Sequence, residues 1–440
     1  REGLAQQPAS SDLADLLPAE PWEASTIHRA LKIHPDRPAH PGFCPDNRLP
    51  ADIVVVDEAS MVDAAMMTRL IDALRPDARL VLLGDQDQLA SVEAGAILGD
   101  LCGVGGDGPS GVSPVLADLA HQVVGPDLEL THSPTGPAIR DAVAHLSHPF
   151  RFGETSGIGR LSRSIRDLAS QTGEVLERTV GLMVERVVAA QGVDGGQDLL
   201  WHSLDEADDL EGRTLAHPDD PASRQRAAVV HREIEQHWGG ILRRALGGFV
   251  NVTDLAGHLD AVRQALLALD DFRVLCTHRR GPRGVETLNR LTKKWLKDIV
   301  DVRGDWFEGC PIMVLKNDYR TNLFNGDVGM VLKAAPGDGP GLRAWFQGPD
   351  NTPRSLVEAR LPAHETVFAM TIHKSQGSQF DHVLLLLPAR DSEFVTRELV
   401  YTGLTRAKER AHLAGSADVL RESLKRRVQR ASGLRERLWG

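Results

Sequence analysis

Short apolar runs divide the sequence into elements typical of an α/β protein. Residues 51–56, 79–83 and 381–388 each form an apolar run followed by polar or turn-forming residues, as expected for strands buried in a parallel sheet. Apolar residues between the first two runs recur at helical spacing, at Met61, Ala65, Met66, Leu70 and Leu74. Strand, helix and strand joined by short links predict two parallel, neighbouring strands that are buried on both faces.

The remaining pattern changes along the chain. Residues 160–270 have a mostly helical pattern with a loop at about 192–224, and a strand starts again at 271. From 311 to 365, short strand-like pieces alternate with turns, and Asn325-Gly326 is a hairpin signal. This predicts a small β-barrel inserted between α/β elements. After the strand at 381–388, we expect a helical region at 393–409 and a short final strand at 411–415.

Composition narrows the class of protein. A chain of 440 residues with 42% apolar and 25% charged residues predicts a soluble protein of two or three domains. No apolar run has the length of a membrane span and the start has no apolar signal core, so we expect a cytoplasmic protein without a membrane partner. The four cysteines have no metal-ligand spacing and are expected to be reduced thiols.

Charge is unevenly distributed. The net charge of −11 argues weakly against a protein coated in nucleic acid, because phosphate binding requires lysine and arginine. Basic runs at 278–284, 291–297 and 424–430 nevertheless allow a narrow basic channel on an acidic body. Taken alone, each run is more often a solvated helix face.

Polar clusters follow the first two predicted strands. Asp57 and Glu58 end the first, and "GDQDQ" at 84–88 ends the second at the same sheet edge. Such carboxylates are common where loops begin, and Ser60 with Asp63 is also typical of a helix start. The functional interpretation is that one carboxylate holds Mg²⁺, the next orients a water for attack on a phosphate, and Gln88 contacts the γ-phosphate.

Two later stretches carry candidate nucleic-acid and phosphate contacts. "TIHKSQGSQFDHV" at 371–383 offers hydrogen-bond donors that suit a nucleic-acid backbone, at Thr371, His373 and Lys374. Arg406 in "YTGLTRAKE", predicted to lie on a helix, suits a transferring phosphate, and Arg151 in "FRFG" is a second candidate. A lone histidine or helical arginine is more often structural, so these assignments depend on their neighbours.

The order of these stretches closely resembles the RecD family, the α subunits of exodeoxyribonuclease V within helicase superfamily 1. The resemblance covers nearly the whole chain and is carried by "LPADIVVVDEASMVD", "LGDQDQLASVEAGAILGDLC", "FRFGETSGIG", "LFNGDVGMVL", "MTIHKSQGSQFDHVLLLLP" and "TRELVYTGLTRAKER". It implies an α/β fold with two RecA-like P-loop NTPase domains, ATP in the cleft between them, and an SH3-like β-barrel inserted in the second.

The resemblance also implies a division of the chain into four parts. These are an incomplete first RecA-like domain (1–145), the first part of the second (146–310), the barrel (311–365) and the rest of the second domain (366–440). The implied activity is ATP-dependent 5′ to 3′ movement on single-stranded DNA and unwinding of duplex ends during double-strand break repair. The implied partners are a RecB-like helicase-nuclease and a RecC-like subunit, so no nuclease centre is expected in this chain.

The roles implied at the nucleotide follow the family motifs. Asp57 would hold Mg²⁺, Glu58 would activate water, Gln88 would detect the γ-phosphate of ATP, and Arg151 and Arg406 would stabilise the transferring charge. Gln379 would lie near the nucleotide sugar, where the family often has glutamate. DNA contacts are implied for Thr371, His373 and Lys374, and, from the early motif "STIHRAL", for Thr26 and His28.

The sequence departs from the family in one large respect. It contains no G-x-x-x-x-G-K-[ST] phosphate loop, which in the family lies upstream of the segment matched by residue 1. We therefore expect an N-terminally truncated chain that alone binds ATP poorly, hydrolyses it slowly and has an uncovered, aggregation-prone sheet edge. Three alternatives stay open: part of an ATP-driven DNA motor, a non-enzymatic remnant that binds DNA or partner subunits, and a stand-alone helicase of the same family.

Overall fold

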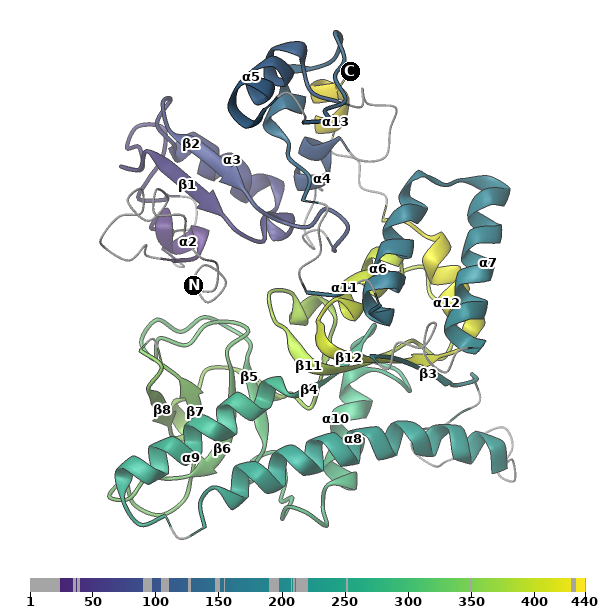
Figure 1. Cartoon of the computed structure of the whole chain (residues 1–440). Helices are drawn as coiled ribbons and strands as arrows, with labels where there is room; N and C mark the ends of the chain where they lie inside the picture. Colours follow the sequence, from purple (N-terminus) through teal and green to yellow (C-terminus); the bar gives the residue numbers. More distant parts are fainter. Residues whose placement is uncertain are drawn as a thin grey trace. The chain divides into compact units, whose positions relative to one another are not determined.

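The computed structural model divides the chain into two compact units, Arg1–Gly84 with Ala90–Leu98, and Asp85–Leu89 with Gly99–Gly440. It describes residues 24–34, 37, 40–89, 97–103, 111–125, 128–146, 151–153, 155–189, 198–206, 208, 210, 221–250, 252–348, 350–428 and 433–439. Each unit is described by itself (Figure 1). The four-part domain division predicted above stays a prediction.

The first unit contains the predicted strand–helix–strand segment. Strands β1 (Ile53–Val56) and β2 (Arg79–Leu82) pair in parallel, with Ile53 opposite Arg79, as predicted. Helix α3 (Ala64–Ala73) connects them, and its first turn is capped by the Asp63 carboxylate, which accepts a 2.8 Å hydrogen bond from the Met66 N–H. Asp63 is therefore the N-cap residue of α3. The short helix η1 (Ala59–Met61) precedes it, and α2 (Ile27–Ala30) lies earlier in the unit.

The predicted burial of these two strands on both faces is wrong. Side chains alternate between more and less exposed positions along β1 and β2, and Ile53, Val55 and Val81 are 59%, 42% and 41% exposed. This alternation is what a sheet covered on one face gives, because neighbouring side chains point to opposite faces. An apolar run alone did not distinguish these two situations.

A five-stranded parallel sheet is the centre of the second unit. Its strand order is β10-β4-β11-β12-β3, and every neighbouring pair is parallel. The strands are β3 (Leu199–Ser203), β4 (Phe272–Cys276), β10 (Ala369–Thr371), β11 (Phe380–Leu386) and β12 (Ala407–Gly415). Parallel pairing brings the carboxyl ends of all five to one edge, where ligands bind in open α/β folds.

Helices cover both faces of this sheet (Figure 1). Val274, Leu384 and Leu386 pack in one core with α8, α9 and α10, whereas Val383 and Leu385 pack in a second core with α6, α7, α11 and α12. These helices are α6 (Gly157–Asp167), α7 (Gly173–Ala189), α8 (Pro221–Gly247), α9 (Leu255–Leu267), α10 (Val285–Trp295), α11 (Arg397–Leu404) and α12 (Ala417–Lys425). The chain also contains α4 (Ile97–Cys102), α5 (Pro114–Val124) and α13 (Leu434–Trp439), which are not part of these two cores. This three-layer α/β arrangement is that of a RecA-like domain.

Short 3₁₀ helices join several of these elements in the second unit. They are η2 (Ala138–Ala142), η3 (Leu168–Ser170), η5 (Ala268–Asp270), η6 (Glu358–Arg360) and η7 (His373–Ser375). Among the described residues, none of the helices is both long and apolar enough to cross a membrane.

An antiparallel sheet follows in the region predicted to be rich in short strands. Its order is β8-β7-β6-β5-β9, from strands β5 (Pro311–Val314), β6 (Val328–Lys333), β7 (Leu342–Gln347), β8 (Pro353–Leu356) and β9 (His364–Thr366). Asn325-Gly326 lies at the end of the β5–β6 connection, where Gly326 has φ 97° and its N–H donates to the Val314 carbonyl at 2.9 Å. The predicted series of short strands is therefore confirmed, while the closure of this sheet into an SH3-like barrel stays a prediction.

Two predictions in the second unit are wrong. The loop expected at 192–224 contains β3, which pairs with β12 at the sheet edge. The helix expected at 393–409 ends at Leu404, and the chain then enters β12, a nine-residue strand that begins before the predicted 411–415. The reason is long-range pairing: β12 lies between β11 and β3, and its pairing with β11 from Ala407 onward extends the strand before the predicted start.

Candidate functional site

The acidic pair of the first unit lies where β1 ends. Asp57 is exposed and its Oδ1 accepts a 2.8 Å hydrogen bond from the Glu58 N–H. Glu58 has a left-handed backbone (φ 52°), which is uncommon for a residue other than glycine and is often found at functional positions. The chain there approaches the end of β2 closely, because the Ala59 N–H donates to the Leu83 carbonyl at 2.8 Å.

Gly84 makes this close approach possible. A Cβ on Gly84 would lie 2.7 Å from Leu98 Cδ2 and 3.1 Å from the backbone nitrogens of Ala59 and Ser60. The glycine of "GDQDQ" thus serves the packing of the two strand ends in the first unit.

The next residues, Asp85–Leu89, pack in the second unit. The Leu89 N–H donates to the buried Thr402 Oγ1 at 2.8 Å, and Gln376 Nε2 donates to the Leu89 carbonyl at 2.8 Å. The Tyr401 hydroxyl donates to Asp85 Oδ2 at 2.9 Å. The backbone N–H and C=O of Leu89 therefore both form hydrogen bonds with side chains that lie more than 280 residues away in the sequence.

Gln88 and Arg406 form the central contact of this region. Arg406 Nη2 donates to Gln88 Oε1 at 2.6 Å, and its other nitrogens donate to the carbonyls of Ser378 and Thr402 at 3.3 Å. Arg406 is buried and lies after the end of α11, not on a helix as predicted. A buried guanidinium must be matched by acceptors, so its position is fixed by these oxygens.

Arg151 and Gln379 lie near the same residues. Arg151 is exposed and its Nη1 donates to the Thr405 carbonyl at 3.1 Å, one residue before Arg406. Gln379 is half-buried and directly follows Ser378, whose carbonyl accepts from Arg406. In the second unit, the structure thus brings Gln88, Arg151 and Arg406 together, with Gln379 adjacent in sequence to one of their partners.

Asp87 in this loop and Tyr401, whose hydroxyl donates to Asp85, both have a raised pKa. Burial, followed by the neighbouring Asp85 carboxylate, raises the pKa of Asp87 to about 6, so that this side chain titrates just below neutral pH. Burial and Asp85 also raise the pKa of the Tyr401 hydroxyl, which therefore stays protonated and able to donate. Asp85, Asp87, Tyr401, Thr402 and Gln376 were not singled out from the sequence, although each lies inside a motif that was.

The predicted DNA contacts of the second unit lie at the carboxyl end of β10. Thr371 ends this strand and its Oγ1 accepts a 3.3 Å hydrogen bond from the Lys374 N–H, while His373 is exposed at the start of η7. Lys374 Nζ is paired with Glu365 Oε1 at 2.6 Å. Lys374 also lines a cavity of about 300 Å³ together with Ser378 and Phe380.

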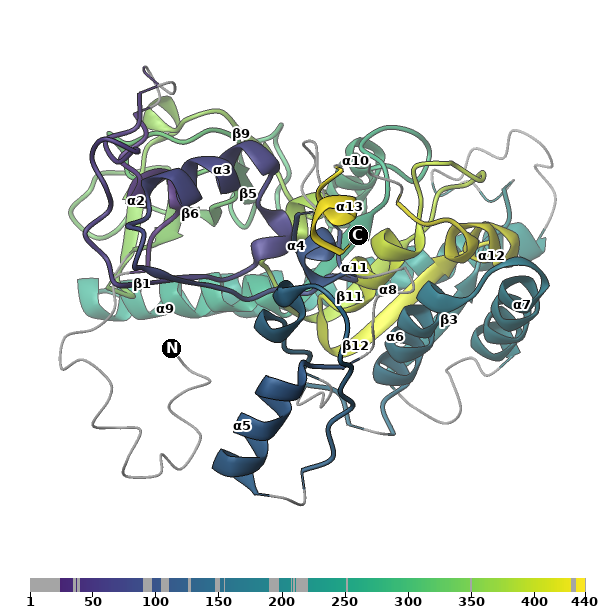
Figure 2. The same ribbon diagram turned by 90° about the horizontal axis from the view of Figure 1, so that it is seen from above.

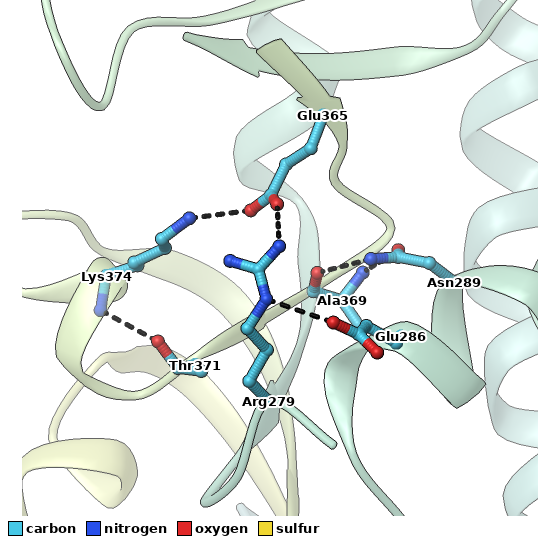
Figure 3. Close-up of polar contacts among 7 residues, drawn as sticks. All are labelled: Arg279, Glu286, Asn289, Glu365, Ala369, Thr371 and Lys374. Atoms are coloured by element: carbon cyan, nitrogen blue, oxygen red, sulfur yellow. Dashed lines mark hydrogen bonds and ion pairs between the residues drawn. The ribbon is translucent and has the colours of Figure 1, made fainter. Parts of the chain in front are cut away.

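Glu365 links this lysine to a second cation (Figure 3). Its Oε2 accepts from Arg279 Nη2 at 3.1 Å, and Arg279 Nε donates to Glu286 at 3.1 Å. Glu286 and Glu365 raise the pKa of the Arg279 guanidinium, which stays charged. Lys374 and Arg279 therefore share the Glu365 carboxylate.

The other two predicted DNA contacts belong to the first unit. Thr26 caps α2, and its Oγ1 accepts from the Arg29 N–H at 3.3 Å, so this hydroxyl has a structural role. His28 lies in the first turn of the same helix and is exposed. These two residues, like Asp57 and Glu58, are placed by the structure within the first unit alone.

Two protein-family models match parts of this chain. Residues 6–110 match the family model described as an AAA domain, and residues 366–414 match that of the UvrD-like helicase C-terminal domain. Similar curated proteins include the RecBCD enzyme subunit RecD of Mycolicibacterium smegmatis, 39% identical over 94% of this chain and 59% of the relative. The same subunit of Haemophilus influenzae is 32% identical over 95% of this chain and 59% of the relative.

A more distant relative is the ATP-dependent RecD2 DNA helicase of Deinococcus radiodurans, 27% identical over 94% of this chain and 43% of that protein. A solved Pif1 helicase from Candida albicans aligns over 88% of this chain and 76% of its own, with 14% identity and a TM-score of 0.38. The chain spans about three fifths of the length of the curated RecD subunits that it matches.

Proposed function

We propose, on the premise that this RecD-like chain belongs to helicase superfamily 1, that it acts as an ATP-dependent 5′ to 3′ DNA helicase subunit. In this proposal it works on duplex ends and single-stranded DNA, beside RecB-like and RecC-like subunits, in double-strand break repair. The support is the identity to RecD subunits over nearly the whole chain, together with the geometry around Arg406.

The contact between Gln88 and Arg406 is the observation that carries the proposal. A buried arginine whose guanidinium lies 2.6 Å from a glutamine amide oxygen has exchangeable donors next to a group that can itself contact a phosphate. When ATP binds, the γ-phosphate oxygens would compete with Gln88 for Arg406, because charged acceptors form stronger hydrogen bonds than amides. Loss of the phosphate after hydrolysis would restore the amide contact, so the pair would respond to the state of the nucleotide.

The remaining nucleotide roles are proposed for Asp57, Glu58, Arg151 and Gln379. Asp57 would hold Mg²⁺, since carboxylate oxygens are the ligands that Mg²⁺ prefers, and bound Mg²⁺ would neutralise phosphate charge. Glu58 would orient the attacking water, in keeping with its left-handed backbone at the end of β1. Arg151 would add a second positive charge, and Gln379 would contact the nucleotide sugar.

DNA binding is proposed for Thr371, His373 and Lys374, and for Thr26 and His28 in the first unit. Lys374 supports this most directly, because its ammonium group already binds a carboxylate that a phosphate could replace. Such contacts carry no sequence information, so binding should depend strongly on salt and little on base sequence.

The proposal is tested by DNA-stimulated ATP hydrolysis of a form of the protein that carries a G-x-x-x-x-G-K-[ST] segment, purified with its partner subunits. The partner helicase is made hydrolysis-deficient so that only this protein is measured. Glu58→Gln should still bind nucleotide but stall turnover, and Arg406→Ala should slow hydrolysis by about 10³-fold or more. Arg390→Ala removes an exposed arginine of the same unit and is the matched control. Normal turnover in either test variant would refute the assigned roles.

The 440-residue chain by itself gives a second readout. Because its sequence has no G-x-x-x-x-G-K-[ST] segment, we expect weak ATP binding and slow turnover by this chain alone. Robust DNA-stimulated turnover by the isolated chain would contradict this expectation while leaving the helicase proposal intact.

A further inference from the structure

Four histidines and one glutamate gather between the parallel sheet and helix α8. His202 lies on β3, His382 on β11 and His412 on β12, whereas Glu233 and His237 lie on α8. Helix α8 packs along the sheet and contacts β3 and β4 (Figure 2). None of these five residues has a part in the nucleotide or DNA sites described above.

The ligand atoms of three of these residues lie close together. His202 Nε2 is 2.9 Å from His412 Nδ1, and Glu233 Oε2 is 3.5 Å from the same His412 nitrogen. One ligand atom from each of the three residues lies within 4.8 Å of the other two. Bonds of 2.0–2.1 Å in a tetrahedral zinc site place neighbouring ligand atoms about 3.3 Å apart, so small side-chain movements would suffice to bind an ion.

Burial favours the metal-binding form of these histidine side chains. His412 is 2% exposed, and its Nε2 is a buried nitrogen without a hydrogen-bond partner among the described residues. Burial favours the neutral imidazole, which is the form that ligates metals. The carboxylate of Glu233 would supply negative charge beside the ion, which a buried divalent cation requires.

We propose that His202, Glu233 and His412 bind one divalent transition-metal ion of the zinc type. Imidazole and carboxylate ligands suit Zn²⁺. The ion would join the edge strand β3 and helix α8 to β12, the strand next to β3 in the sheet.

The test uses cobalt as a spectroscopic probe. The purified protein is treated with a chelator and titrated with Co²⁺, whose visible absorption reports tetrahedral nitrogen and oxygen ligation, and Zn²⁺ is then added as a competitor. We expect one equivalent of Co²⁺ to bind and to be displaced by Zn²⁺. Zn²⁺ should also raise the melting temperature, because a ligand that binds only the folded state stabilises it.

Two variants and one control locate the site. His202→Gln and Glu233→Gln each replace a half-buried ligand and should weaken metal binding by at least about tenfold. His231→Gln alters another α8 histidine, which stacks on Trp295 at 4.4 Å and is not one of the proposed ligands, and should bind as the unaltered protein does.

Three results would overturn the proposal. They are the absence of visible Co²⁺ bands at saturation, the same affinity in both ligand variants as in the unaltered protein, or an equal loss in His231→Gln. In those cases the His202–His412 contact is an ordinary hydrogen bond between two neutral rings. Circular dichroism without metal shows whether each variant is folded, and either ligand variant alone is sufficient for the test.

Discussion

The Thr402 hydroxyl is a sensitive point of the structure, because it holds the Asp85–Leu89 segment in the second unit. We expect Thr402→Val to release this segment locally. Valine keeps the shape of threonine but removes the oxygen that accepts the 2.8 Å hydrogen bond from the Leu89 N–H. Thr402 is fully buried and Leu89 is 5% exposed, so water does not readily replace the lost acceptor.

The expected magnitude follows from the cost of an unsatisfied buried donor. Leaving a buried N–H without a partner costs about 1–3 kcal/mol, which corresponds to an increase of about 5-fold to 150-fold in the equilibrium constant for local opening. The Gln376 contact to the Leu89 carbonyl remains, so the segment should open more often without detaching permanently. Gln88 would then spend less time within reach of Arg406, and we expect DNA-stimulated ATP hydrolysis to fall as well.

Hydrogen–deuterium exchange of the Leu89 amide measures this effect directly, because the amide exchanges only when its hydrogen bond opens. Thr402→Ser retains the hydroxyl and is the control, since it removes only a methyl group and should leave the Leu89 amide protected. If Thr402→Val exchanges at Leu89 as slowly as the unaltered protein, the hydrogen bond does not hold this segment and the reasoning is refuted.

Two further predictions concern charged groups in the second unit. Asp87→Asn should stabilise the protein by on the order of 1–3 kcal/mol at pH 8: folding raises the pKa of Asp87 to about 6, so the stability contributed by its protonated form is present below about pH 4 and lost as pH rises through 6. Glu365→Gln should tighten binding of a single-stranded oligothymidine by about 1.5-fold to 5-fold in fluorescence anisotropy, because Lys374 and Arg279 lose their shared carboxylate.

Each of these predictions has its own control. The gain in stability from Asp87→Asn, measured by thermal unfolding, should vanish by pH 4, where the aspartate is itself neutral. A gain that stays constant across pH would contradict the statement that burial raises the pKa of Asp87. The gain from Glu365→Gln should shrink at high salt. Asp418→Asn changes the net charge equally at an exposed pair with Arg421, so an equal gain there would show a general charge effect.

Local patterns in the sequence were sufficient for the elements that are long or strongly periodic. The strand–helix–strand of the first unit and the strands β4 and β11 were predicted from apolar spacing and turn residues. The short strands in the region 311–365 were predicted from the alternation of short apolar pieces with turns. These features depend on neighbours within about ten residues, so the sequence alone contains the information.

Other elements depend on distant partners. Strand β3 is five residues long and has only Leu199 and Trp201 as buried side chains, so its pattern did not differ from a loop until its pairing with β12 was known. The end of α11 at Leu404 was missed for a related reason. The following residues are polar enough to continue a helix, and pairing with β11 makes them the start of a strand.

The sequence by itself determined which chemical groups the chain offers: a carboxylate pair and a glutamine after two strands, and arginines in two later motifs. Tertiary structure alone decided that Gln88 contacts Arg406, 318 residues away, and that Thr402 and Gln376 hold the peptide next to it. Side-chain type is encoded residue by residue, whereas a hydrogen bond requires two atoms within about 3 Å of each other. Between residues this far apart, only the packing of the sheet and its helices can set that distance.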